Sequence, residues 1–327
     1  MLTLPSEITS EIFTHFLPPY PQRPPLAGPH FPWSLLQICR QWRDVALTIP
    51  TLWSTMKLYV DDSALQQHAL QLHVLDLCME RSRHHPLSIA LLCPSEVVDI
   101  AFVTPFAEAI SPHVSRIRDL ELRLPHEHLG CLTGSMSLLR RLIVGPREFL
   151  PAASHVSEEL QQKLFSDAPN LRDVILSSRF DPFCITLPWS QFTSLTASLY
   201  CQEAAEILRH SALLEICNIS VYDPGDVQPP ISTLRALPSL SSFRLLWRDE
   251  GSDGDAPSLQ QFFSVLAFPA LESLVVSHRF LGDDPVAAIV ALRRKGYPRQ
   301  IAIHDSRTNE SVFEAAFPDA ELCVWSD

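Results

Sequence analysis

A short phrase recurs along most of this sequence, and it limits the possible folds more than any other feature. Residues 169–176, 238–245 and 269–276 share one eight-residue pattern. Its first residue is proline, its third is leucine, and its sixth and eighth are apolar. The closing alternation predicts a β-strand with one buried face. Looser copies extend the series, with central apolar positions at Ala90, Leu120, Leu142, Val174, Leu195, Cys217, Phe243, Leu274, Ile301 and Leu322. A unit that returns every 21 to 32 residues indicates stacked supersecondary units, each completing the core of its neighbour.

Helix-forming stretches lie between the expected strands, at residues 62–82, 158–165, 202–210, 258–266 and 284–295. Alternating strands and helices predict an α/β fold with parallel strands, right-handed connections and helices on the outside. Residues 58–327 resemble a degenerate leucine-rich-repeat solenoid. The asparagine ladder usual in that family is missing and the spacing is uneven. An ordinary α/β sheet therefore stays open as the alternative.

In such a solenoid the apolar residues of each strand point into the core, and the residues between them face the concave surface. Those exposed positions form the predicted substrate-binding surface, which mixes both signs of charge with aliphatic side chains and so suits a protein partner. The alternative is that each is an ordinary solvated strand position. The residues we select are Arg123, Arg141, Ile143, Asp173, Ile175, Asn218, Arg244 and Val275.

The first 57 residues show a different pattern, that of short amphipathic helices. Pro5 suits the first helical position, and the apolar residues from Ile8 to Leu17 share one face up to Pro18. A capping box at Ser34 and Gln37 predicts a second helix that runs to Pro50. So few residues make a small core. The helices therefore either cap the domain that follows or complete their packing against a partner.

The order of motifs in this segment is specific: Leu4-Pro5-Ser6-Glu7-Ile8, Ile12-Phe13, Cys39-Arg40-Gln41-Trp42-Arg43 and Pro50-Thr51-Leu52-Trp53. It resembles the F-box, the module by which substrate receptors bind the Skp1 adaptor of cullin-type ubiquitin ligases. The family usually joins its first two helices by a short turn, whereas residues 18–33 here form a proline-rich insertion, as in fungal members. We expect this insertion to be a plain connector.

The resemblance implies a substrate-recognition adaptor of an SCF-type (Skp1–cullin–F-box) ligase, which binds Skp1 and through it cullin, without catalytic residues or cofactors of its own. Trp42 and Trp53 fit equally well as core of the helices themselves. Two alternatives stay open: a non-ligase interaction scaffold, and an α/β enzyme with an unrecognised active site. The residues that the resemblance places against Skp1 are Leu4, Pro5, Ile8, Ile12, Phe13, Leu35, Leu36, Cys39, Trp42 and Trp53.

Composition narrows the partners further. The net charge of −12 falls almost wholly on residues 61–327, which argues against nucleic acid. No apolar run is long enough to span a membrane and no secretory signal is apparent, so we expect the cytoplasm or nucleus. The eight cysteines form no Cys-x-x-Cys motif, and we expect buried, reduced thiols. We find no phosphate loop or nucleophile elbow, and neither His126-Glu127-His128 nor the acidic stretch 249–255 has metal-ligand spacing.

Overall fold

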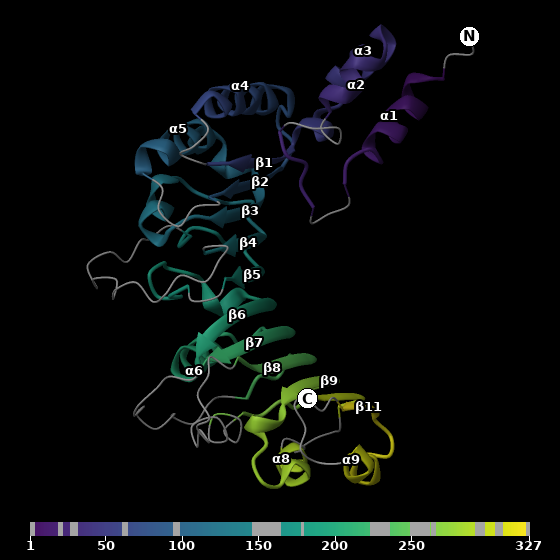
Figure 1. Ribbon diagram of the computed structural model, residues 1–327, viewed down its shortest axis with the longest axis vertical. Helices are drawn as coiled ribbons and strands as arrows, with labels where there is room; N and C mark the ends of the chain where they lie inside the picture. Colours follow the sequence, from purple (N-terminus) through teal and green to yellow (C-terminus); the bar gives the residue numbers. More distant parts are fainter. Residues whose placement is uncertain are drawn as a thin grey trace. The chain divides into compact units, whose positions relative to one another are not determined.

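The computed structural model (Figure 1) describes residues 4–18, 22–26, 32–60, 65–93, 99–145, 165–177, 180–222, 236–248, 262, 266–291, 298–304 and 310–324. Contacts divide the chain into two compact units. The first contains residues 1–171 and 183–187, and the second contains residues 172–182 and 188–327. Both units have the same α/β architecture, with parallel strands that follow one another in chain order.

Short helices open the first unit: α1 (Ser6–Thr14), α2 (Trp33–Ile38), α3 (Arg40–Thr48) and the 3₁₀ helix η1 (Pro50–Trp53). The sequence predicted one helix from Ser34 to Pro50, and this was wrong, because Cys39 is extended (φ −159°, ψ 167°) and divides it. The Cys39 Sγ accepts a hydrogen bond from the Trp42 N–H at 3.4 Å, which caps α3. The capping box was also misplaced, since α2 begins at Trp33 after Pro32.

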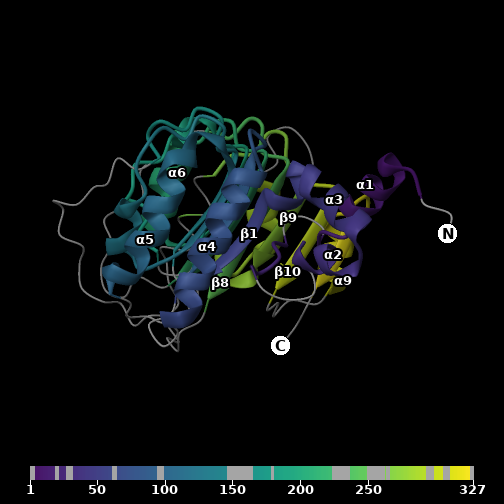
Figure 2. The same cartoon turned by 90° about the horizontal axis from the view of Figure 1, so that it is seen from above.

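The strands of the first unit are β1 (Thr55–Tyr59), β2 (Leu87–Leu92), β3 (Ile117–Arg123) and β4 (Arg141–Val144). The helices between them are α4 (Leu65–Arg81), α5 (Ile100–Ile110), η2 (Ser111–Arg116) and η3 (His126–Cys131). Both views place α4 and α5 on one side of these strands (Figures 1 and 2). The expected boundary at residue 57 falls inside β1, so the N-terminal helices lead directly into the sheet.

The second unit continues the pattern with β5 (Asp173–Leu176), β6 (Ser194–Tyr200), β7 (Ile216–Tyr222), β8 (Ser242–Arg248), β9 (Ser273–Ser277), β10 (Gln300–His304) and β11 (Glu321–Val324). Its helices are η5 (Trp189–Gln191), α6 (Cys201–His210), η6 (His278–Phe280), α8 (Pro285–Ala291) and α9 (Glu310–Ala316). The strand pairs described in this unit are all parallel.

The repeat read from the sequence appears as a ladder of paired core residues. In the second unit Val174, Leu195, Cys217, Phe243, Leu274, Ile301 and Leu322 are register partners on successive strands. In the first unit the ladder runs Met56, Ile89, Leu120 and Leu142. Ala90 was therefore one residue off, and the strand at Met56 was missed. Along β6, β7 and β8 most buried residues alternate with more exposed ones, as the repeat predicts.

The helix predictions have mixed outcomes. Residues 62–82 and 202–210 correspond to α4 and α6, and the stretch from 284 begins α8. Residues 158–164, 258–261, 263–265 and 292–295 of the predicted helices, like the acidic stretch 249–255, lie outside the described residues. The cysteines are free, and five are buried, but Cys39 and Cys323 are exposed, contrary to expectation. Burial raises the pKa of the Cys78 thiol to about 12, so that thiol stays protonated and unreactive near neutral pH.

Candidate docking surface and strand face

Helix α1 is apolar on two faces. Thr9 and Phe13 face inward, and the Phe13 ring lies 4.9 Å from the Trp42 ring in an edge-to-face arrangement. Ile8 and Ile12, one helical turn apart, lie on another face, and Leu4 precedes the helix four residues before Ile8; each of the three residues is 46–51% exposed. A surface helix normally presents polar residues to solvent. We call these three residues the α1 stripe, and an aliphatic stripe of this kind is typical of a protein interaction site.

The junction between α2 and α3 exposes a second apolar position. Ile38, the last residue of α2, is 58% exposed, and the neighbouring Cys39 is exposed as well. The Arg43 Nε donates a hydrogen bond of 2.9 Å to the Leu36 carbonyl, which holds the two helices together across the break. Ile38 follows the helical period of the single helix that the sequence predicts, which would place it on the apolar face of that helix. Once the helix divides at Cys39, that period no longer applies.

The structure sorts the predicted docking residues into two groups. Phe13, Leu35 and Trp53 are buried within the chain itself, so they support the docking helices and do not form part of their surface. Leu36 and Trp42 are half-buried. The predicted residues that are exposed are Leu4, Pro5, Ile8, Ile12 and Cys39.

Trp53 anchors the N-terminal helices to the body. Its Nε1 donates to the Ala46 carbonyl at 3.0 Å, and its ring lies 5.4 Å from that of Trp33. The Arg81 guanidinium, at the end of α4, stands over both indoles, 4.6 Å from the Trp53 ring centre and 5.1 Å from that of Trp33. Cation–π contacts contribute roughly 0.5–2 kcal/mol each. Of the two interpretations open from the sequence, the structure favours Trp53 as core.

The proline-rich insertion is more than a connector. We call its described part, residues 22–26, the strap. The Lys57 N–H donates to the Pro24 carbonyl at 3.1 Å, and Pro25 forms a parallel bridge with Lys57 on β1. Arg23 is buried, with its Nε 2.9 Å from the Ser88 Oγ and its Nη1 2.8 Å from Glu121 Oε2. The other Glu121 oxygen lies 3.0 Å from the Arg123 Nε.

The predicted substrate-binding residues have different surroundings in the two units. In the first unit Arg123 pairs with Glu121, beneath the strap, and Ile143 is only 7% exposed. Ile143 is therefore not on an open surface, which corrects the sequence prediction. Arg141 and Asp173, the latter at the start of β5, are half-buried.

In the second unit the structure brings four of the predicted residues into one row. Register pairing places Ile175, Asn218, Arg244 and Val275 side by side on strands β5 to β9, with Thr196 between the first two. Arg244 is the exposed member of the row, and the others are half-buried. The Asn218 Nδ2 donates to the Thr196 Oγ1 at 3.4 Å. This row, which we call the Arg244 row, is the most coherent part of the predicted strand face.

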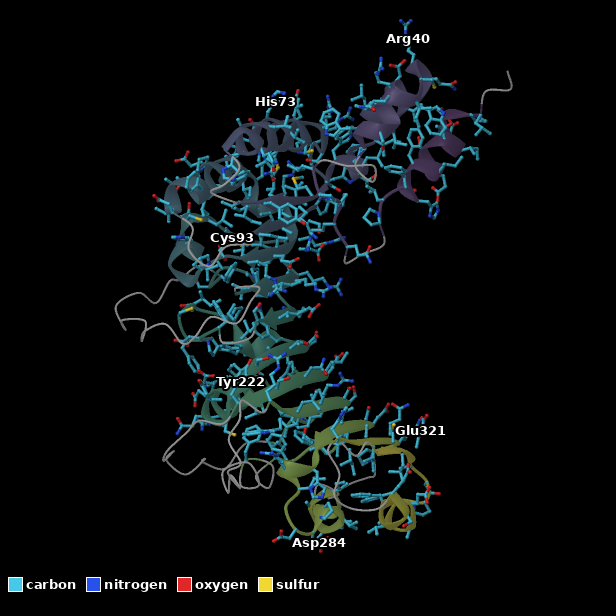
Figure 3. The ribbon with its side chains drawn as sticks, in the orientation of Figure 1. Arg40, His73, Cys93, Tyr222, Asp284 and Glu321 are labelled. Atoms are coloured by element: carbon cyan, nitrogen blue, oxygen red, sulfur yellow. The ribbon has the colours of Figure 1, made fainter. Side chains whose placement is uncertain are left out.

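A further row lies at the carboxyl ends of three strands and was missed from the sequence. Tyr200, Tyr222 and Arg248 are register partners, and the Arg248 Nη1 donates to the Tyr222 hydroxyl at 3.1 Å. The two tyrosine rings are 6.1 Å apart, and Tyr222 is labelled in Figure 3. The repeat phrase covers only the first half of each strand. These residues can be identified from the sequence if the alternation of apolar and other residues is continued beyond the phrase to the ends of the strands.

Beside this row, Glu203 lies in the first turn of α6 and accepts a hydrogen bond from the Tyr200 N–H at 2.9 Å. Burial raises the pKa of its carboxyl from 4.5 to about 7; the hydrogen bond opposes the rise and the Asp181 charge adds to it. Within the described residues, no group of three or more His, Cys, Asp or Glu side chains is placed to hold a metal ion. No helix in the described ranges is both long and apolar enough to cross a membrane.

No protein-family model matches the sequence, and no curated protein matches it at a significant level.

Proposed function

We propose that this protein is a substrate-recognition adaptor of an SCF-type ubiquitin ligase. The N-terminal helices bind a Skp1-like protein, and the body, a degenerate leucine-rich-repeat-like solenoid, holds a protein substrate on its strand face. The adaptor carries out no chemistry. It works by proximity, because a substrate held near the ubiquitin-transfer enzyme reacts at a raised effective concentration.

The α1 stripe is the observation that carries the proposal. Leu4, Ile8 and Ile12 belong to the motif order that resembles the F-box, and all three are about half exposed although they are large and aliphatic. Covering such side chains with a partner removes apolar surface from water at about 25 cal/mol per Å². Phe13 and Trp53 fill the inner side of these helices, and about half of the surface of each stripe residue remains open for a partner to cover.

The body supports the proposal through its topology. Strands in chain order with register-matched core residues are the arrangement of a solenoid, in which each repeat contacts only its neighbours. Its strand face offers the Arg244 row, where a basic, an amide and two aliphatic side chains lie together. A mixed row of this kind suits a polypeptide better than a nucleic acid or a metal ion.

The test is binding of purified chain to a Skp1-like protein by isothermal titration calorimetry. The double variant Ile8→Asp/Ile12→Asp should lose binding at least a hundredfold while its circular dichroism is unchanged. The matched control is Leu70→Asp, which charges an aliphatic residue that is 58% exposed on α4 and should bind normally. Equal binding by the double variant and the control would refute the docking assignment.

Recovery of cullin together with Skp1 separates a ligase adaptor from a scaffold that uses only the Skp1 contact. Affinity purification of the intact chain should recover both proteins, and a chain lacking residues 1–57 should recover neither. Skp1 recovered without cullin would favour the scaffold.

A further inference from the structure

We propose that the strap fixes the docking helix α1 in place, with Arg23 as the positioning residue. This inference rests on the proposed function where it concerns Skp1 affinity. The strap itself is a feature of the fold, and its closure can be measured with no partner present.

The strap closes the free edge of the sheet. Strand β1 is the first in the sheet order, so its outer side would otherwise expose unpaired backbone groups. The strap meets that edge through the hydrogen bond from Lys57 to Pro24 and the bridge at Pro25. Pro24 and Pro25 have no N–H, so they cannot recruit a further strand beyond the strap. Leu26, only 4% exposed, anchors the end of the segment.

Arg23 provides the specific attachment. Its side chain is 2% exposed and crosses from the strap to two strands, with one contact to Ser88 on β2 and one to Glu121 on β3. A guanidinium suits this position because its rigid, planar group can donate hydrogen bonds to two acceptors at once. Glu121 also contacts Arg123, so it keeps a cationic neighbour when Arg23 is replaced. Substitution of Arg23 should therefore release the strap without leaving an isolated charge in the sheet.

The strap acts on α1 because the connection between them is short. Four residue steps separate Pro18, the last described residue after α1, from Gln22, the first residue of the strap. An extended chain covers at most about 3.6 Å per residue, so these two residues lie within about 14 Å of each other. With Arg23 held on β2 and β3, the end of α1 stays within that distance of the strap, and this tether acts together with the packing of Phe13 against Trp42 to limit the movement of the α1 stripe.

The first measurement is residue-resolved hydrogen exchange of the Lys57 amide in the full chain. Arg23→Met should accelerate its exchange roughly ten- to hundredfold, the range expected when a hydrogen bond to a charged group is lost. Arg23→Lys keeps the charge but not the fork and should show a smaller acceleration. The control is Arg118→Met, which removes the exposed member of the ion pair with Asp119 on β3 and should leave the Lys57 amide protected.

The second measurement reports on α1 directly. Spin labels at position 7 on α1 and position 80 on α4, in a chain with Cys39→Ser and Cys323→Ser, should give a narrow distance distribution. Arg23→Met should broaden it and weaken Skp1 binding about tenfold, with exchange in β7 to β9 unchanged. An unaltered Lys57 amide or an unaltered distribution would overturn the inference. If the parent chain fails to bind Skp1, the proposed function fails, and the exchange and distance measurements still decide the role of the strap.

Discussion

Replacing Trp53 by phenylalanine separates the two roles that the sequence left open for this residue. If Trp53 belongs to the core, as the structure indicates, Trp53→Phe destabilises the N-terminal helices but preserves the docking surface. If it contacts the partner, the substitution weakens binding and has little effect on folding.

The size of the effect follows from two lost contacts. The hydrogen bond from the indole N–H to the Ala46 carbonyl is lost, but that carbonyl still accepts from the Ile49 N–H at 3.4 Å, so the loss costs about 0.5–1.5 kcal/mol. The cation–π contact with Arg81 also weakens, because tryptophan is the strongest partner for a cation, which adds roughly 0.5–1 kcal/mol. The sum is about 2 kcal/mol, which corresponds to an opening equilibrium changed on the order of thirtyfold.

Hydrogen exchange measured by mass spectrometry can follow this change locally. Peptides that cover residues 40–54 should exchange on the order of thirtyfold faster in the variant, and peptides from β7 and β8 should not change. Skp1 affinity, measured where the helices remain folded, should fall less than threefold. Unchanged exchange together with a large loss of affinity would refute the assignment of Trp53 to the core.

Three further predictions concern the body. Phe243→Ala removes a fully buried ring that lies 4.7 Å from Phe268 and should cost about 3–5 kcal/mol in urea unfolding; a loss below 1 kcal/mol would contradict the core ladder. The raised pKa of Glu203 means that the folded state holds this proton more tightly than the unfolded chain, so the contribution of Glu203 to stability should be greatest below pH 4.5 and be lost as the pH rises to about 7. Glu203→Gln keeps the capping acceptor and should remove that part of the pH dependence in thermal unfolding, whereas an identical profile would exclude Glu203 as its source. Arg244→Glu should change stability by less than about 0.5 kcal/mol, because the residue is exposed, yet remove specific proteins from affinity purifications that still contain Skp1; an unchanged protein set would count against the Arg244 row.

Local patterns in the sequence were enough to predict most of the strands. Around Phe243 and Leu274, apolar and other residues alternate within the repeat phrase itself, which is enough to indicate a strand. The buried face of the sheet then fixes the register, because a shift of one residue would turn the apolar side chains toward solvent. The copy near Ala90 was placed one residue off because every residue of β2 is buried. Its sequence therefore does not alternate, and nothing in it shows which residues face the core. Strand β1 was missed because Pro50 and Leu52 belong to the motif that resembles the F-box and stand one residue farther from Met56 than the leading proline and leucine of the repeat do.

Features that depend on distant residues could not be predicted in this way. Arg23 contacts Ser88 and Glu121, which lie 65 and 98 positions away, and a single arginine among prolines gives no sign of either partner. The break at Cys39 was missed for a different reason. Residues 33–48 have helical periodicity throughout, and only the cap that Cys39 provides to Trp42 shows where the second helix begins.

The most direct test of the central claim is a hydrogen-exchange footprint of the full chain with and without a Skp1-like protein. The account predicts protection at residues 4–14 and 36–39, where the α1 stripe and Ile38 are exposed, and no change at the Arg244 row on β5 to β9. Protection confined to the strand face, with α1 unaffected, would contradict it.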